Sequence, residues 1–174
     1  MPCGCVSFPV LPLLSCCPAF PSPVTSVSPF LTLCVFAVVS LSCLLLVESL
    51  TFGRIPIPVT VCKGYNIPQF VSPHTLFIAC SYSGDTEETL AAVNKAMLKR
   101  AHIICITSGG KMLELAKEYN LFYIQVPGGS PSPRAQIGYM MVSLLAALYH
   151  TNLIGAAFIK ETENSIEYLD RGEK

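Results

Sequence analysis

From residue 55 onward, short apolar runs alternate with segments whose apolar residues recur at helical spacing. The apolar runs have strand length and are rich in β-branched residues, which is typical of strands buried on both faces of a sheet. They lie at 57–62, 75–80, 102–106 and 122–126. The segments with helical spacing lie at 86–100, 111–119, 134–149 and 161–169. This alternation, with short connections, predicts an α/β fold: a doubly wound parallel sheet with flanking helices.

The loop after 75–80 reads Ser81-Tyr-Ser83-Gly84-Asp85-Thr86 and opens a helix. Ligands of parallel sheets bind beyond the carboxyl ends of the strands, where this loop must lie. Gly84 permits a tight turn, and a helix N-terminus offers unpaired N–H groups to an anion. With the hydroxyls of Ser81, Ser83 and Thr86, this predicts a phosphate site made of neutral donors. The alternative is a capping box with Thr86 or Asp85 as the cap, but capping explains only one hydroxyl.

The loop after 102–106 contains Ser108, Gly109 and Gly110 and also joins a strand to a helix. Two interpretations stay open for it. Its glycines can let the backbone pass close to a bound sugar, or it is a glycine-rich turn in which Ser108 caps the helix.

The loop after 122–126 ends in Pro133-Arg134-Ala135. Proline favours the first position of a helix, so Arg134 falls in the first turn, where its charge opposes the helix dipole. An arginine there is better explained by an anion or a polar reaction intermediate than by helix stability. The alternative is an arginine that is simply exposed to solvent.

Residues 1–50 differ in composition from the rest of the chain. They contain one charged side chain, Glu48, and six of the nine cysteines. The uncharged run 30–47 is just long enough to suggest a membrane anchor, but no Lys or Arg precedes it to set an orientation. The interpretation we favour is that 1–43 is an apolar segment, rich in Cys, Pro and Ser, that is foreign to the fold.

The cysteines predict no metal site, because those near the N-terminus have no partner ligand at zinc-like spacing. Those in the predicted strands, Cys62, Cys80 and Cys105, are most simply small hydrophobes, and their wide spacing suggests reduced thiols in a cytosolic protein. The formal net charge is zero, which offers no electrostatic reason to expect nucleic acid or an anionic membrane as a partner.

The segment SYSGDTEETL at 81–90 resembles the signature of SIS domains, which bind phosphosugars. The segments ITSGGKMLELA at 106–116 and VPGG…PRAQIGY at 126–139 narrow the resemblance to the bifunctional phosphoglucose/phosphomannose isomerases. The resemblance implies an SIS-type three-layer sandwich, incomplete here, with 44–155 as the sugar-phosphate-binding domain and 156–174 as a linker helix towards a second domain. It also implies a cytoplasmic homodimer that needs no cofactor.

In that family the substrate is a hexose 6-phosphate, and glucose 6-phosphate or mannose 6-phosphate is interconverted with fructose 6-phosphate. By the resemblance, Ser81, Ser83 and Thr86 bind the phosphate, and Arg134 stabilises the charge of the cis-enediolate intermediate. Ser108, Gly109 and Gly110 lie where the sugar would be contacted.

This sequence departs from the family pattern in two places. The family's first strand and its Gly-Met-Gly-Gly-Ser loop have no match in 1–43, and neither the glutamate nor the histidine of the second domain is matched. We therefore expect this chain alone to lack the catalytic acid and base. The alternatives are a non-catalytic SIS sensor of sugar phosphates, although no basic helix precedes the domain, and a membrane-anchored sugar-phosphate binder using residues 30–47.

Overall fold

The computed structural model describes residues 32–37, 55–129 and 136–155, together with the single positions 49, 53, 157, 160, 161, 164, 168 and 171. In chain order, its elements are β1 (Thr32–Ala37), β2 (Val59–Cys62), β3 (Thr75–Cys80), α2 (Glu87–Leu98), β4 (His102–Thr107), α3 (Gly110–Glu118), β5 (Phe122–Gln125) and α4 (Ile137–His150). The strands form one sheet in the order β2-β1-β3-β4-β5, and every neighbouring pair is parallel. The predicted parallel α/β fold is confirmed.

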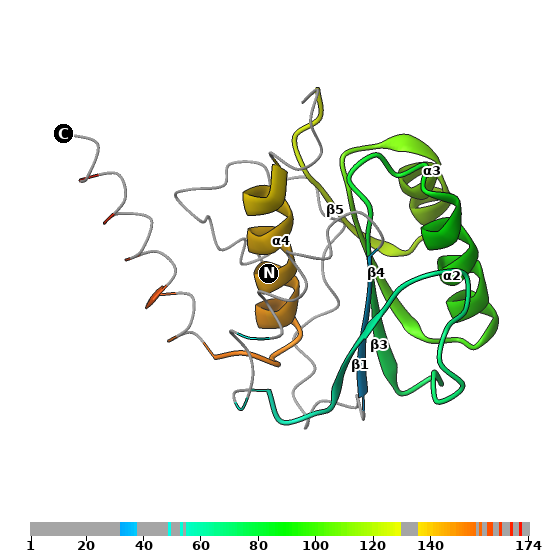
Figure 1. Cartoon of the computed structure of the whole chain (residues 1–174), viewed down its shortest axis with the longest axis horizontal. Helices are drawn as coiled ribbons and strands as arrows, with labels where there is room; N and C mark the ends of the chain where they lie inside the picture. Colours follow the sequence, from blue (N-terminus) through cyan, green and yellow to red (C-terminus); the bar gives the residue numbers. More distant parts are fainter. Residues whose placement is uncertain are drawn as a thin grey trace, which may run out of the picture.

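The sheet is the middle of three layers, with α2 and α3 on one face and α4 on the other (Figure 1). Side chains of β3 alternate between the two outer layers. Leu76 and Ile78 pack with α4, whereas Phe77 and Ala79 pack with α2 and α3. All of them are buried. The uninterrupted apolar sequence of this strand is therefore what coverage on both faces requires.

The prediction that residues 1–43 are foreign to the fold is wrong for β1. This strand pairs with β2 on one side and with β3 on the other, and Leu33, Cys34 and Val35 are buried. Within residues 32–37 the lack of charge has a structural reason. A strand that lies between two neighbours and is covered on both faces buries side chains on both sides, where a charge would be unfavourable. The sheet thus begins before the expected domain boundary at residue 44. Residues 1–31 and 38–48 lie outside the described residues.

β1 also contradicts the interpretation of 30–47 as a membrane anchor, for the residues of that run that the structure describes. Residues 32–37 are extended and hydrogen-bonded within the sheet rather than helical. Among the residues that the structure describes, none of the helices has the length and apolar character that crossing a bilayer demands.

Helix ends differ slightly from the periodicity because a residue with left-handed backbone follows each helix. After α2, Arg100 has φ 57°. Its N–H donates to the Met97 carbonyl at 2.9 Å, and the N–H of Ala101 donates to the Ala96 carbonyl at 3.1 Å, which is a Schellman motif. Asn120 and Asn152 have the same backbone conformation after α3 and α4. These stops keep the connections short and bring each following segment back to the sheet.

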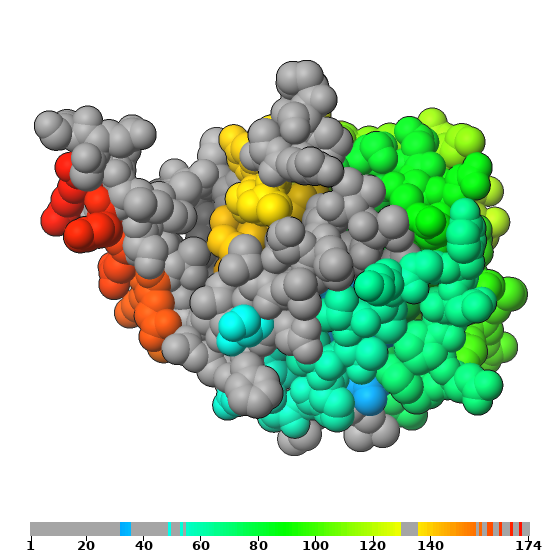
Figure 2. Space-filling model, viewed as in Figure 1, coloured from blue at the N-terminus to red at the C-terminus, as the bar shows by residue number. Residues whose placement is uncertain are grey.

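The connection from β2 to β3 runs over the outside of the molecule, where its blue-green atoms form the lower part of the face in Figure 2. Lys95 of α2 and Lys99, the residue that directly follows this helix, hold the connection in place. The Nζ of Lys95 donates to the Tyr65 carbonyl at 2.7 Å, and the Nζ of Lys99 donates to the Gln69 carbonyl at 3.0 Å.

Two predicted helices are only partly described. The segment predicted at 134–149 is helical from Ile137 to His150. Of the predicted helix 161–169, positions 161, 164 and 168 are helical, and the remainder lies outside the described residues.

Candidate functional site

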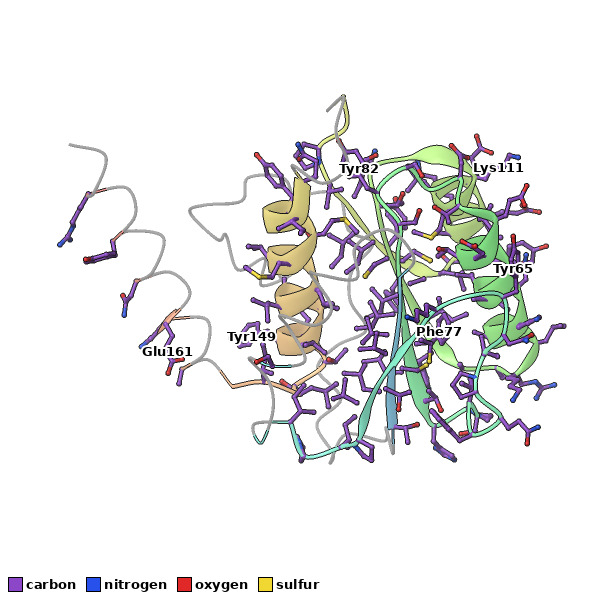
Figure 3. All side chains as sticks on the ribbon, viewed as in Figure 1. Tyr65, Phe77, Tyr82, Lys111, Tyr149 and Glu161 are labelled. Atoms are coloured by element: carbon purple, nitrogen blue, oxygen red, sulfur yellow. The ribbon has the colours of Figure 1, made fainter. Side chains whose placement is uncertain are left out.

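The strand order places the loop of residues 81–86, called the serine loop below, at the reversal point of the sheet. From β1 the chain first goes to β2 on one side and then crosses to β3 on the other. Ala37 at the end of β1 is paired with Cys80 at the end of β3, and Ser81 follows directly. The crevice outside the carboxyl ends of two such strands is where doubly wound sheets bind ligands. Tyr82 and Lys111 mark this end of the sheet in Figure 3.

Two of the three predicted phosphate-binding hydroxyls meet in this loop. The Oγ of Ser81 and the Oγ1 of Thr86 are 2.9 Å apart. Ser81 is only 3% exposed, and its Oγ also accepts the N–H of Gly84 at 3.2 Å. Ser83 is exposed, and its Oγ accepts the N–H of Asp85 at 3.4 Å. The structure therefore brings Ser81 and Thr86 together and leaves Ser83 at the solvent side.

The Thr86 side chain does not cap α2, so the alternative role considered for it is not observed. Thr86 is the N-cap residue of α2, but its side chain makes no capping hydrogen bond, because its hydroxyl lies against Ser81 instead. One turn later, the hydroxyl of Thr89 is buried and has no hydrogen-bond partner among the described residues. The first turn of α2 thus presents N–H groups that these hydroxyls do not cap, as an anion site requires.

The serine loop packs backbone against backbone on residues 108–110, which join β4 to α3. Gly84 has φ 76°, and a Cβ placed on it would overlap the carbonyl oxygen of Gly109. Gly110 has φ 69°, and a Cβ there would overlap the carbonyl oxygen of Ser83. The close approach that glycine permits here is therefore between two loops of the protein itself.

The hydroxyl of Ser108 is used within the protein. Its Oγ donates to the Tyr82 carbonyl at 2.6 Å, and its N–H donates to the same oxygen at 3.0 Å. The residue before α3 is Gly109, and it makes no side-chain cap, so the alternative of Ser108 as a helix cap is wrong. Contact of Ser108, Gly109 or Gly110 with a sugar stays a prediction.

The cap of α3 comes from the serine loop, which sequence spacing did not predict. The Oδ1 of Asp85 accepts the N–H of Lys111 at 3.0 Å, and the Gly84 carbonyl accepts the N–H of Met112 at 3.0 Å. Because Asp85 lies 26 positions before Lys111, only the adjacency of β3 and β4 brings the two loops together.

The third loop is described only as far as Gly129. The Tyr82 hydroxyl donates to the Pro127 carbonyl at 3.1 Å, which ties this loop to the serine loop. Arg134, predicted to be the catalytic residue, lies outside the described residues. In the described part of the chain, no group of three or more His, Cys, Asp or Glu side chains is arranged to hold a metal ion.

Comparison with known proteins identifies relatives by sequence. No family model matches the chain. The chain is 42% identical over 109 residues to the bifunctional phosphoglucose/phosphomannose isomerase of Caldicellulosiruptor bescii, which covers 63% of this chain and 32% of that protein. It is 46% identical over 88 residues to the enzyme of the same name from Thermoplasma acidophilum, covering 51% of this chain and 27% of that protein. The chain thus spans about a third or less of the length of these curated relatives.

Solved structures agree on the fold. The crystal structure of tagatose-6-phosphate ketose/aldose isomerase from Escherichia coli superposes with a TM-score of 0.52 at 19% identity, covering 75% of this chain and 40% of that one. Identity this low speaks for the architecture alone.

Proposed function

We propose that this chain, an SIS-type domain homologous to part of the bifunctional phosphoglucose/phosphomannose isomerases, binds the phosphate group of a hexose 6-phosphate at its serine loop. The observation that carries the proposal is the meeting of the Ser81 and Thr86 hydroxyls, 2.9 Å apart, at a helix N-terminus that neither of them caps. That point lies beside the end of β1, where the sheet reverses its order.

The binding chemistry relies on donors rather than on net charge. Glu87 and Glu88 occupy the first turn of α2, so the helix terminus is not an electropositive patch. A phosphate there is held by hydroxyl and backbone N–H groups, each of which makes a charge-assisted hydrogen bond to an anionic oxygen. The Ser81 and Thr86 hydroxyls now bond each other and can rotate their protons towards an incoming oxygen.

We also propose the reaction that this domain serves: the interconversion of glucose 6-phosphate or mannose 6-phosphate with fructose 6-phosphate. The names of the relatives support this assignment. Arg134 is proposed to offset the negative charge of the enediolate intermediate, since a fixed cation lowers the energy of a developing oxyanion. The homodimer and the cytoplasmic location stay predictions.

Binding is tested by titrating the folded, isotope-labelled protein with fructose 6-phosphate and following the backbone amide resonances. We expect the resonances of the 81–86 loop and of the first turn of α2 to shift, and inorganic phosphate to shift the same set. Fructose without its phosphate is the matched control and should leave that set in place. A folded sample whose loop resonances ignore both phosphorylated ligands would contradict the proposal.

Turnover is a separate measurement. We expect this 174-residue chain to bind without isomerising, because proton transfer between C1 and C2 needs a base within hydrogen-bond reach and the family's glutamate and histidine have no match in it. A coupled assay for glucose 6-phosphate checks this, with a chain purified from a host that lacks its own isomerase. Product formed at a rate proportional to the added chain would show the expectation to be wrong.

A further inference from the structure

Two cysteine side chains meet in the core between the first two strands of the sheet. Cys34 lies in β1 and Cys62 ends β2, and their Sγ atoms are 3.2 Å apart. Cys34 is completely buried, and Cys62 is 8% exposed. Both belong to the hydrophobic cluster packed beneath α2 and α3. The spacing of 28 positions hides this pair in the sequence, where the two appear to belong to unrelated segments.

Strand register explains why the two sulfurs face each other. In the parallel pairing of β1 with β2, Cys34 lies opposite Thr60 and Phe36 lies opposite Cys62. The cysteines are therefore diagonal neighbours, and side chains two positions apart on a strand point to the same face. A disulfide has a sulfur–sulfur length of about 2.05 Å, so the two atoms need to approach by only about 1 Å. Cys62 is the last residue of β2.

The two thiols differ in acidity because of the hydrogen bond between them. A hydrogen bond from Cys34 lowers the pKa of Cys62, against the opposing effect of burial. The same bond, together with burial, raises the pKa of Cys34. Burial without such a partner raises the pKa of Cys105 to about 12. Cys62, which is also the more exposed of the pair, is therefore the thiol that ionises and reacts first.

We propose that Cys34 and Cys62 are a redox-sensitive pair that forms a reversible disulfide between β1 and β2 when the protein meets a hydroperoxide. This stands apart from sugar-phosphate binding. Disulfides of reducing compartments are typically transient and redox-sensing.

The chemistry balances with hydrogen peroxide as the oxidant. The Cys62 thiolate attacks one peroxide oxygen, the O–O bond breaks, and the departing hydroxide takes up the thiol proton as water. This leaves a sulfenic acid on Cys62. The Cys34 sulfur then attacks the Cys62 sulfur, the S–O bond breaks, and the hydroxyl leaves as water with the Cys34 proton. Two thiols and one peroxide give one disulfide and two waters.

The remaining two described cysteines serve as internal controls. Cys80 and Cys105 lie on neighbouring strands, and Cys80 is opposite Ile106. They pack on opposite faces of the sheet, Cys80 with α4 and Cys105 with α2 and α3. Their sulfurs cannot meet without unfolding, so we expect both to stay reduced under the same treatment.

The test treats the folded chain with hydrogen peroxide, blocks remaining thiols with an alkylating reagent, and maps the digested protein by mass spectrometry. We expect one dominant linked product that joins the Cys34 peptide to the Cys62 peptide, is two hydrogen atoms lighter than the free pair, and disappears on reduction with dithiothreitol. Oxidation in denaturant should instead give mixed pairings among the nine cysteines.

Variants keep the test decisive. Cys105→Ser removes a thiol from the same cluster and should leave the linked product unchanged, whereas Cys62→Ser should abolish it in a sample shown to be folded by its melting curve. The proposal is overturned if wild-type protein retains both thiols, links Cys34 to another cysteine, or carries an unlinked oxidised Cys62. These outcomes need only the wild-type chain, so they hold even if a variant fails to fold.

Discussion

Replacing Gly84 with alanine is expected to destabilise the protein by about 2–5 kcal/mol. The backbone of Gly84 is left-handed, with φ 76°, and an alanine in that conformation costs about 1–2 kcal/mol. The added methyl group would also overlap the Gly109 carbonyl oxygen and approach the Thr107 Oγ1 to 2.8 Å, and such overpacking typically costs about 1–3 kcal/mol. Denaturant unfolding followed by circular dichroism measures the loss.

Two other glycines separate these contributions. Gly64 has φ 87° but nothing within 4 Å of an added Cβ, so Gly64→Ala should cost only the backbone part, about 1–2 kcal/mol. Gly109 has an extended backbone with open space around its Cβ position, so Gly109→Ala should change stability little. If Gly84→Ala cost no more than Gly64→Ala, the two loops would not be packed as the structure has them.

Local pattern was sufficient for most of the fold. The run 75–80 is apolar at every position from Leu76 on, and only a strand covered on both faces accommodates that. The turn at Gly84 and the following helix could also be predicted, because the effects of glycine and of hydroxyl residues on the backbone are local.

Where local pattern failed, the missing information was a contact between distant segments. β1 looks like any other part of an uncharged run, and only its ladders to β2 and β3 distinguish it from a membrane segment. Ser108 and Asp85 do not have the capping roles considered for them from the sequence, for the same reason. Ser108 donates to the Tyr82 carbonyl in the serine loop, and Asp85 accepts the Lys111 N–H in the first turn of α3. No spacing rule within one segment predicts such a bond.

The contacts between the serine loop and residues 108–112 also bear on the proposed phosphate site. Because Asp85 and the Gly84 carbonyl cap α3 while the Ser108 side chain donates to the Tyr82 carbonyl, the backbone of the serine loop is held in place by its neighbours in the protein. Binding then requires little rearrangement of the loop, and preorganised donors keep the cost of ordering low. A substitution that removes one hydroxyl while keeping this frame should therefore affect affinity more than stability.

Thr86→Val is that substitution, and it is expected to weaken hexose 6-phosphate binding roughly 10- to 100-fold. Valine keeps the shape of threonine and removes the hydroxyl, and a hydrogen bond to a charged group contributes about 1.5–3 kcal/mol, with about 1.4 kcal/mol for each factor of ten. Stability should fall by only about 1 kcal/mol, because the variant loses the hydrogen bond to the Ser81 hydroxyl but no helix cap, since the Thr86 side chain does not cap α2. Isothermal titration calorimetry with fructose 6-phosphate measures the change in affinity.

The matched variants for this measurement come from the same residue type. Thr86→Ser retains the hydroxyl and should keep affinity within a few-fold of the wild type. Thr151→Val removes a hydroxyl that donates to the Ala147 carbonyl at 2.9 Å, at the end of α4 away from the serine loop in Figure 1, and should leave binding unchanged. Equal affinity for Thr86→Val and wild type would mean that the Ser81–Thr86 pair does not hold the phosphate. An equal loss in Thr151→Val would instead attribute the effect to the fold, and only a loss confined to the Thr86 hydroxyl supports the site.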